Sequence, residues 1–510
     1  MAAINSAVAP NTSFYQTVHQ EPESQETFFT WGSRCITVLT SNIPSWCSSA
    51  FAYWRPFFIS EDPDLMPRLL SDVEGIILGY AFTDASQFIR YSKFAKTSDM
   101  MVILHHNNLL VSSILRSVEG DLNALSPNVK EALLSVGDTI TELSCNKCGI
   151  TPESLKNIVQ AFPRLKHLSL KCCPWIDDKA LIHLITLKDH LKSLNLTGCM
   201  GISNDGLNHI AKLTELEELY LYTFSDAPNL ALLAPLTQLR VLRLEGYSAP
   251  DFTHFALFSS LTKLSVYVTD QNGGVPVVDL TSLANLTSLI KLHLTGVAIS
   301  DAILAHLSHL TFLTDLNLSG KHPRSYQGGV TDVGVLHFEQ FFPRLKKLNL
   351  SGQAITDVGL AHLALCKGLT ELKLSVCPGI TSAGFAPFAA TGTLLRKLDL
   401  SDCYTTPAQL HSNITDDICN HLAQFVHLTH LNLQGMVNAP SVEQQIISSA
   451  ALERLKIQLP NLKIASSGNT FWESIGRLRK ELFTDRFATI LYLSVRDKCC
   501  PSVLKNLFSL

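Results

Sequence analysis

Cysteine pairs are the residues of this 510-residue chain whose spacing first suggests a chemical site. Cys145 and Cys148 have the C-x-x-C spacing of zinc and redox sites. A zinc site needs further ligands, and no second C-x-x-C pair completes one. Cys145 and Cys148, like Cys173 of the adjacent pair Cys172-Cys173, fall at fixed positions of a repeating pattern. We therefore expect structural thiols here, with no metal and no cofactor.

Histidines and catalytic motifs lead to the same expectation. Six histidines recur because the repeat recurs, and all fall in its expected helical segments: His183, His209, His306, His337, His362 and His421. The sequence contains no phosphate-binding G-x-x-x-x-G-K-[ST], no H-E-x-x-H and no G-x-S-x-G motif. The sequence thus predicts no catalytic residues and no enzymatic activity.

Composition narrows the class of protein. Hydrophobic residues make up 46% of the chain, which argues against a disordered protein. The net charge of −4, without a block of like charge, argues against nucleic acid as the main partner. The 13 cysteines, with no secretory signal at the N-terminus, indicate a reducing, cytoplasmic location. We expect no membrane span, because no run of 18 apolar residues occurs.

A repeated sequence pattern covers most of the chain, so the repeat must determine where any functional side chains lie. L-x-x-L-x-L strand signatures follow one another at intervals of 22 to 33 residues. They begin at Ile140, Leu165, Leu191, Leu216, Leu239, Leu261, Leu289, Leu313, Leu345, Leu369, Leu395, Leu428 and Leu452. A period in the low to middle twenties is typical of leucine-rich repeats. The predicted fold is a curved α/β solenoid of about thirteen repeats, with parallel strands on its concave face and helices on its convex face.

Two positions refine the repeat subtype. Cysteine stands eight residues after the first strand leucine in five repeats, where a small polar side chain can bond the turn backbone between repeats: Cys148, Cys173, Cys199, Cys377 and Cys403. An Ile followed by Thr, Ser or Asp then comes at the expected start of the convex helix, as in Ile355-Thr356. These repeats resemble the cysteine-containing leucine-rich repeats of F-box proteins.

The helices before the array strengthen that resemblance. Residues 61–112 show three helical stretches, and Met66-Pro67 with the helix that follows resembles an F-box. The resemblance implies that a Skp-type adaptor binds the apolar face of the first helix: Leu69, Leu70, Val73, Ile76 and Ile77. The alternative is a plain helical cap for the solenoid.

The remaining segments complete the expected domain organisation. Residues 1–60 form a polar tail and an apolar aromatic segment, and residues 113–139 a helical N-terminal cap. The repeat domain spans 140–465, and 466–510 form a helical C-terminal cap over its last apolar edge.

The outward strand positions are the default binding surface. Most of them are Ser, Thr, Asn or Lys, but three neighbouring repeats differ. They carry Tyr220, Tyr222, Arg243, Glu245 and Tyr267. Tyr and Arg are enriched at interface hot spots, which predicts that this concave patch binds a protein substrate. The alternative is that exposed Tyr on strands reflects β propensity alone.

Two functions remain open at this stage. The resemblance implies a substrate-recognition subunit of an F-box-type (SCF-like) ubiquitin ligase, or a bacterial mimic of one delivered into a host cell. The alternative is a leucine-rich-repeat scaffold or sensor with no link to ubiquitin.

Overall fold

The computed structural model describes residues 85–93, 97–105, 107–223, 228–246, 249–268, 279–320, 329–391, 394–403, 414–434 and 447–465. The chain divides into two units, residues 1–81 and residues 82–510, and all described residues belong to the second. The tail expected at 1–60 and the helical cap expected at 466–510 lie outside the described residues.

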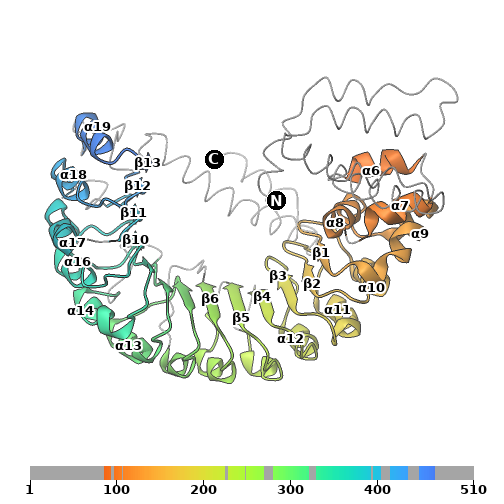
Figure 1. Ribbon diagram of the computed structural model, residues 1–510. Helices are drawn as coiled ribbons and strands as arrows, with labels where there is room; N and C mark the ends of the chain where they lie inside the picture. The colour runs from red at the N-terminus through yellow and green to blue at the C-terminus, as the bar shows by residue number, and fades with distance from the viewer. Residues whose placement is uncertain are drawn as a thin grey trace, which may run out of the picture. The chain divides into compact units, whose positions relative to one another are not determined.

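Thirteen strands form one parallel sheet in which each strand pairs with its neighbours in sequence (Figure 1). They are β1 (Glu142–Ser144), β2 (His167–Ser169), β3 (Ser193–Leu196), β4 (Glu218–Thr223), β5 (Val241–Gly246), β6 (Lys263–Val268), β7 (Lys291–Thr295), β8 (Asp315–Asn317), β9 (Lys347–Asn349), β10 (Glu371–Lys373), β11 (Lys397–Asp399), β12 (His430–Asn432) and β13 (Lys463–Ala465). The expected curved leucine-rich-repeat solenoid is confirmed.

The strand register follows from the leucines. Leu372 pairs with Leu348 on one side and Leu398 on the other, so that equivalent leucines stack from repeat to repeat. All three are buried, while the residues on either side of each face outward. This alternation is the period of two that a strand imposes on its side chains.

One predicted strand start is wrong. Leu452 lies in helix α19 (Ser449–Gln458), and the thirteenth strand begins at Lys463. The L-x-x-L spacing of Leu452 and Leu455 suits a helix as well as a strand, and both leucines point into the core from the helix.

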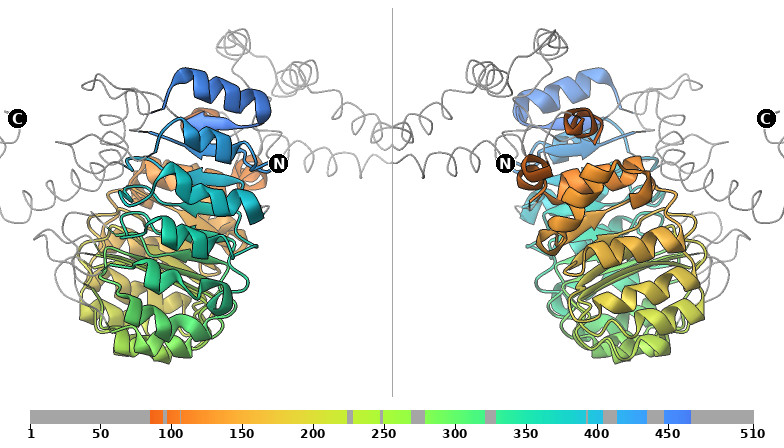
Figure 2. Two further views of the ribbon diagram at one scale, coloured as in Figure 1. Left: turned by 90° about the vertical axis from the view of Figure 1, so that its left-hand side faces the viewer. Right: turned by 90° about the vertical axis from the view of Figure 1, so that its right-hand side faces the viewer.

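Helices stack along the outer side of the array (Figure 2). The α-helices are α10 (Pro152–Ala161), α11 (Asp178–Leu181), α12 (Asn204–Ile210), α13 (Asp301–His306), α14 (Asp332–Val335), α15 (Phe338–Phe341), α16 (Asp357–Leu363), α17 (Ala386–Thr391), α18 (Asp417–Leu422) and α19. Tighter 3₁₀ turns complete or replace them at η4 (Ile182–Leu187), η5 (Leu230–Leu233), η6 (Phe252–Leu257), η7 (Thr281–Asn285), η8 (Leu307–His309) and η9 (Ser382–Phe385).

Helices also precede the first strand: α6 (Ala85–Ser92), α7 (Thr97–Leu104), α8 (Asn108–Ser117) and α9 (Pro127–Ser135), with 3₁₀ turns η2 (Leu122–Ala124) and η3 (Gly137–Thr139). Helix α8 covers the open edge of the sheet. The Ser112 hydroxyl accepts from the Ser144 backbone amide at 3.0 Å, and the side-chain Oδ1 of Asn108 accepts from the Thr141 backbone amide at 3.3 Å. Edge amides that would otherwise be unpaired are thus satisfied.

The repeated cysteines connect one repeat to the next. The Cys173 thiol donates to the carbonyl of Cys145 at 3.0 Å, and the Cys403 thiol to the carbonyl of Leu374 at 3.0 Å. Burial raises the pKa of the Cys173 thiol to about 12, so it stays protonated as a donor. In another repeat Gln353 takes this position and bonds the Leu318 carbonyl at 2.6 Å. The expected structural role of these side chains is confirmed.

An aspartate clasp joins successive convex helices. Asp332, the first residue of α14, accepts from the amide and hydroxyl of Thr356 in the next repeat, at 2.9 and 2.5 Å. Thr356 in turn caps α16 by accepting from the Val358 amide. The same clasp joins Asp178 to Ser203, Asp301 to Thr331, Asp357 to Thr381 and Asp416 to Ser448.

The glycine of the I-T-D-x-G-L element makes room for this clasp. A Cβ on Gly359 would lie 2.3 Å from Oδ1 of Asp332 and 2.9 Å from Ile355. Gly384 stands in the same relation to Asp357. The repeat of Gly359 therefore presents Thr356 and Gly359 to the preceding Asp332, and Asp357 to the following repeat.

Candidate protein-binding surface

The concave face changes character at three neighbouring strands. Strands β4, β5 and β6 are six residues long, whereas most others span three. The extra length adds a third outward position to each strand, after the two that shorter strands also have. Tyr222, Glu245 and Tyr267 occupy it and are aligned with one another across the sheet.

Arg243 is the centre of this surface. Its Nε donates to Oε1 of Glu245 at 2.6 Å, and its guanidinium lies 4.6 Å from the centroid of the Tyr267 ring. Its side chain is nevertheless 41% exposed, compared with 18% for Glu245. A carboxylate and an aromatic face thus hold the guanidinium in one orientation, and an edge of it stays available to a partner.

The two tyrosines of β4 differ in accessibility. Tyr220 is half-buried and its hydroxyl lies 3.5 Å from Oε2 of Glu218. Burial, together with the nearby Glu218 carboxylate, raises the pKa of Tyr220. Tyr222 is only 9% exposed, so it supports the surface from below and offers a partner little area. We name the set Tyr220, Tyr222, Arg243, Glu245 and Tyr267 the Arg–Tyr patch.

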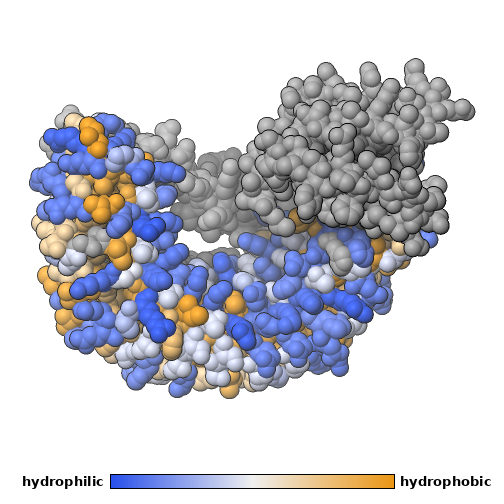
Figure 3. Space-filling model, viewed as in Figure 1, coloured by the Kyte–Doolittle hydropathy of each residue, from blue (hydrophilic) through white to orange (hydrophobic). Residues whose placement is uncertain are grey.

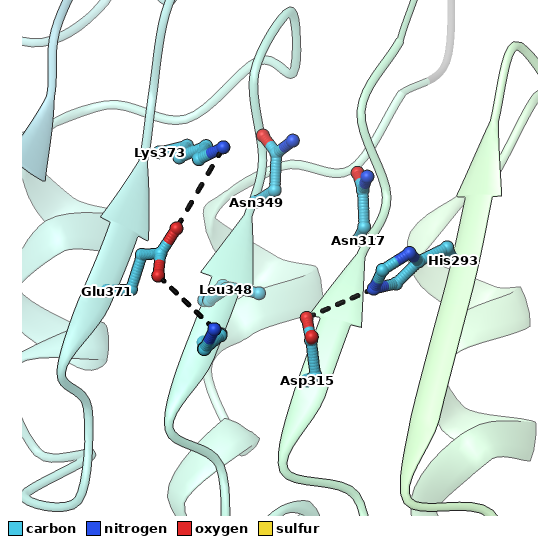
Figure 4. Close-up of a pocket in the computed structure, with 8 residues that line it drawn as sticks. His293, Asp315, Asn317, Leu348, Asn349, Glu371 and Lys373 are labelled. Atoms are coloured by element: carbon cyan, nitrogen blue, oxygen red, sulfur yellow. Dashed lines mark hydrogen bonds and ion pairs between the residues drawn. The ribbon is translucent and has the colours of Figure 1, made fainter. Parts of the chain in front are cut away.

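A polar depression lies beside this patch on the sheet, and Figure 4 shows the side chains that line it. The Tyr267 hydroxyl lies 3.4 Å from Nδ1 of His293, whose Nε2 lies 3.1 Å from Oδ1 of Asp315. The depression has a volume of 160 Å³ and is lined by His293, Asp315, Asn317, Lys347, Leu348, Asn349, Glu371 and Lys373. The patch and the depression therefore form one continuous polar surface.

Ion pairs organise the depression. Burial alone would raise the pKa of Asp315, but the hydrogen bond from His293 and the charges of Lys291 and Lys347 hold it below its ordinary value. Glu371 lies within 3.6, 3.9 and 3.7 Å of the ammonium groups of Lys347, Lys373 and Lys397.

Sequence reasoning found the Arg–Tyr patch but missed the residues of the depression. His293, Asp315, Lys347, Glu371 and Lys373 occupy the same outward strand positions as Glu218 and Arg243. Reading these positions across aligned repeats would have found them. Hydrophilic side chains also dominate the inner rim of the array in the space-filling view (Figure 3).

The remaining sequence predictions concern the adaptor-binding residues, metal ligands and membrane spans. The adaptor-binding residues Leu69, Leu70, Val73, Ile76 and Ile77 lie outside the described residues, whereas the second and third expected helices are α6 and α7. In the described ranges no group of three or more His, Cys, Asp or Glu is arranged to hold a metal ion. Within that same part of the chain, no helix has the length and apolar character to cross a bilayer.

The repeat, the parallel sheet and the convex helices define a leucine-rich-repeat protein. The chain is similar to F-box/LRR-repeat protein 17 of Arabidopsis thaliana, with 23% identity over 360 residues, or 64% of this chain. It spans 59% of the length of that relative. The likeness to F-box proteins with leucine-rich repeats, expected from the sequence, is thus found among curated proteins. No protein-family model matches the sequence.

Two solved structures align with much of the chain at low sequence identity. The complex of Rad7 and Elc1 in yeast aligns with a TM-score of 0.48 and 18% identity, covering 88% of this chain and 100% of that one. An internalin of Listeria monocytogenes aligns with a TM-score of 0.42 and 21% identity, covering 70% of this chain and 95% of that one.

Proposed function

We propose that the chain is the substrate-recognition subunit of an F-box-type ubiquitin ligase. The segment containing Leu70 and Ile77 binds a Skp-type adaptor, and the concave face binds the protein to be ubiquitinated. The subunit contributes recognition and positioning, and the chemistry takes place on other subunits.

The Arg–Tyr patch is the observation that supports the proposed recognition of a substrate protein. Arg243 is already oriented by Glu245 and Tyr267, so a partner that binds it orders few additional side chains. Arg and Tyr held in this way have the character of a binding hot spot. The similarity to an F-box/LRR-repeat protein supports the link to ubiquitin.

Co-purification with a Skp-type adaptor tests the ligase half. The wild-type chain should retain the adaptor, and a Leu70→Asp/Ile77→Asp variant should lose it, because two carboxylates would be buried in an apolar contact. Equal retention by the two chains would contradict the F-box assignment. It would leave the alternative of a scaffold or sensor unrelated to ubiquitin.

Substrate recognition is tested separately. A Tyr222→Ala/Tyr267→Ala variant should retain the adaptor but capture less of the partner protein. Unchanged capture of the partner would remove the Arg–Tyr patch from the proposal while leaving the adaptor contact standing.

A further inference from the structure

A row of alternating charge runs across five strands of the concave face. The first outward residues of β7 to β11 are Lys291, Asp315, Lys347, Glu371 and Lys397, aligned in register. Every second strand thus presents a lysine, and the strand between two lysines presents a carboxylate. We name Lys291, Lys347 and Lys397 the lysine strip.

The two kinds of charge differ in accessibility. The lysine side chains are 43%, 51% and 54% exposed, whereas Asp315 and Glu371 are each 17% exposed. Each carboxylate lies 3.6 to 3.8 Å from an ammonium group of the strip. The carboxylates therefore steady the lysines from below. Because an ammonium group has three donors, each lysine keeps donors for a partner.

The surroundings add to the positive charge. Lys346 and Arg396 precede β9 and β11 and are both exposed. Lys373 lies beside Asp399, but Asp399 already accepts from the amide and hydroxyl of Ser401, at 3.0 and 2.7 Å. With Lys346, Lys373 and Arg396 added to the strip, an anionic partner meets more cations than anions along this row.

The spacing of the strip selects the shape of that partner. Adjacent strands lie about 4.8 Å apart, so lysines on alternate strands recur about every 9.6 Å. A polyproline II segment advances about 9.3 Å per turn of three residues. Its residues at every third position lie on one side, and three such residues match the three lysines.

We propose that the lysine strip binds an extended acidic segment of the partner protein, with a carboxylate at every third residue in polyproline II conformation. This proposal rests on the proposed function, because it names the class of protein segment that the concave face recognises. The Arg–Tyr patch adjoins the strip through His293, so one partner segment can reach both.

A peptide fits this surface better than a nucleic acid. Single-stranded nucleic acids are held largely by stacking on aromatic side chains. Among the residues that line the depression, His293 alone has an aromatic ring, and that ring already contacts Tyr267 and Asp315. The carboxylates of Asp315 and Glu371 beneath the strip would also repel a continuous phosphate backbone.

Peptide binding to the full-length chain tests the proposal. The probe is a fluorescein-labelled peptide of four Glu-Pro-Pro repeats, and its isomer has the same composition with the glutamates consecutive. Fluorescence anisotropy in low salt should show at least ~10-fold tighter binding of the repeating peptide, and the binding should weaken as salt is added. Equal affinity for the two peptides would overturn the proposal without any variant having to fold.

Variants then locate the site. A K291Q/K347Q/K397Q chain should bind the repeating peptide at least ~10-fold more weakly, about 1.4 kcal/mol. The control K156Q/K188Q/K456Q removes the same charge from the convex side and should bind like the wild type. K291R/K347R/K397R, which keeps the charge, should retain binding. Undiminished binding by the glutamine variant of the strip, or tighter binding of single-stranded DNA than of the peptide, would overturn the assignment.

This outcome is separable from that of the proposed function. If the repeating peptide fails to bind while the adaptor and the partner are still captured, the acidic-segment proposal is wrong and the function stands. If the adaptor is not retained but the repeating peptide binds more tightly than its isomer, the acidic-segment proposal stands and the proposed link to ubiquitin fails.

Discussion

Two regions of the array build the same core with different connections. From β8 to β11 every strand spans three residues, and aspartate clasps join the convex helices. From β4 to β6 the strands continue to six residues, and 3₁₀ turns η5 and η6 replace the helices. Asp251, at the start of η6, caps its own turn by accepting from Thr253, at 3.0 and 2.7 Å, instead of reaching the next repeat.

The two regions differ in what they add to the common core: clasps on the convex side in the regular repeats, and an extra outward strand position on the concave side in the irregular ones. The clasp and its glycine fix the distance between successive helices, so a regular repeat has few residues free to change. In the irregular repeats the longer strands add an outward position, and the Arg–Tyr patch lies there. The Arg–Tyr patch, which we propose as a binding surface, therefore lies where the repeat pattern is lost.

The clasp glycine provides the largest expected effect. Gly359→Ala places a Cβ 2.3 Å from Oδ1 of Asp332, and should lower the free energy of unfolding by about 2–3 kcal/mol. Without that contact, Ala in place of Gly in a helix would raise it by up to about 1 kcal/mol. Chemical denaturation of the two chains measures the difference.

A double variant decides whether the aspartate causes the effect. Asp332→Ala removes the obstructing carboxylate, so the loss in D332A/G359A should be smaller than the sum of the two single losses. Additive losses would show that Gly359 acts through something other than the clasp.

The aspartates of the two regions should contribute differently to the free energy of unfolding. Asp332→Ala removes both hydrogen bonds from Thr356 and leaves the Thr356 amide without this acceptor. The free energy of unfolding should fall by about 1–2 kcal/mol. Asp251→Ala removes only an exposed local cap and should cost less. Equal losses measured in the same denaturation experiment would contradict the distinction between the regions.

The smallest expected effect on stability is in the turn after β10. Val376 has a φ of +58°, in the left-handed region that a β-branched residue adopts at a cost, and the equivalent position after β9 is Gly352. Val376→Gly should stabilise the chain by about 0.5–1 kcal/mol, measured as a higher midpoint of thermal unfolding. A lower midpoint would show that the Val376 side chain contributes packing that outweighs the backbone strain.

Much of the fold could be predicted because leucines repeat in register and each strand reads the same signature. The thirteenth strand was misplaced because Leu452 and Leu455 have a spacing common to strands and helices. The roles of Thr and Cys in the repeat could be predicted from their hydrogen-bonding chemistry. The clasp could not, because it joins Asp332 to Thr356 across 24 residues and becomes visible only when repeats are stacked.

The candidate site was predictable only in part, for a related reason. Tyr and Arg stand out among small polar residues, so the Arg–Tyr patch could be found by residue type. Lys291, Lys347 and Lys397 are unremarkable singly, and their significance lies in a spacing set by the sheet. Burial also separates Tyr222 from Tyr220, which the strand alternation places on the same face.

Partner capture by matched variants tests the central proposal that the Arg–Tyr patch of the irregular repeats binds the partner protein. Arg243→Ala/Tyr267→Ala removes an Arg–aromatic pair with a separation of 4.6 Å, and Arg344→Ala/Phe312→Ala removes another with the same separation outside the Arg–Tyr patch. Quantitative affinity capture should show at least ~10-fold less partner protein on the first variant and an unchanged amount on the second. Equal capture by the two variants would contradict the account.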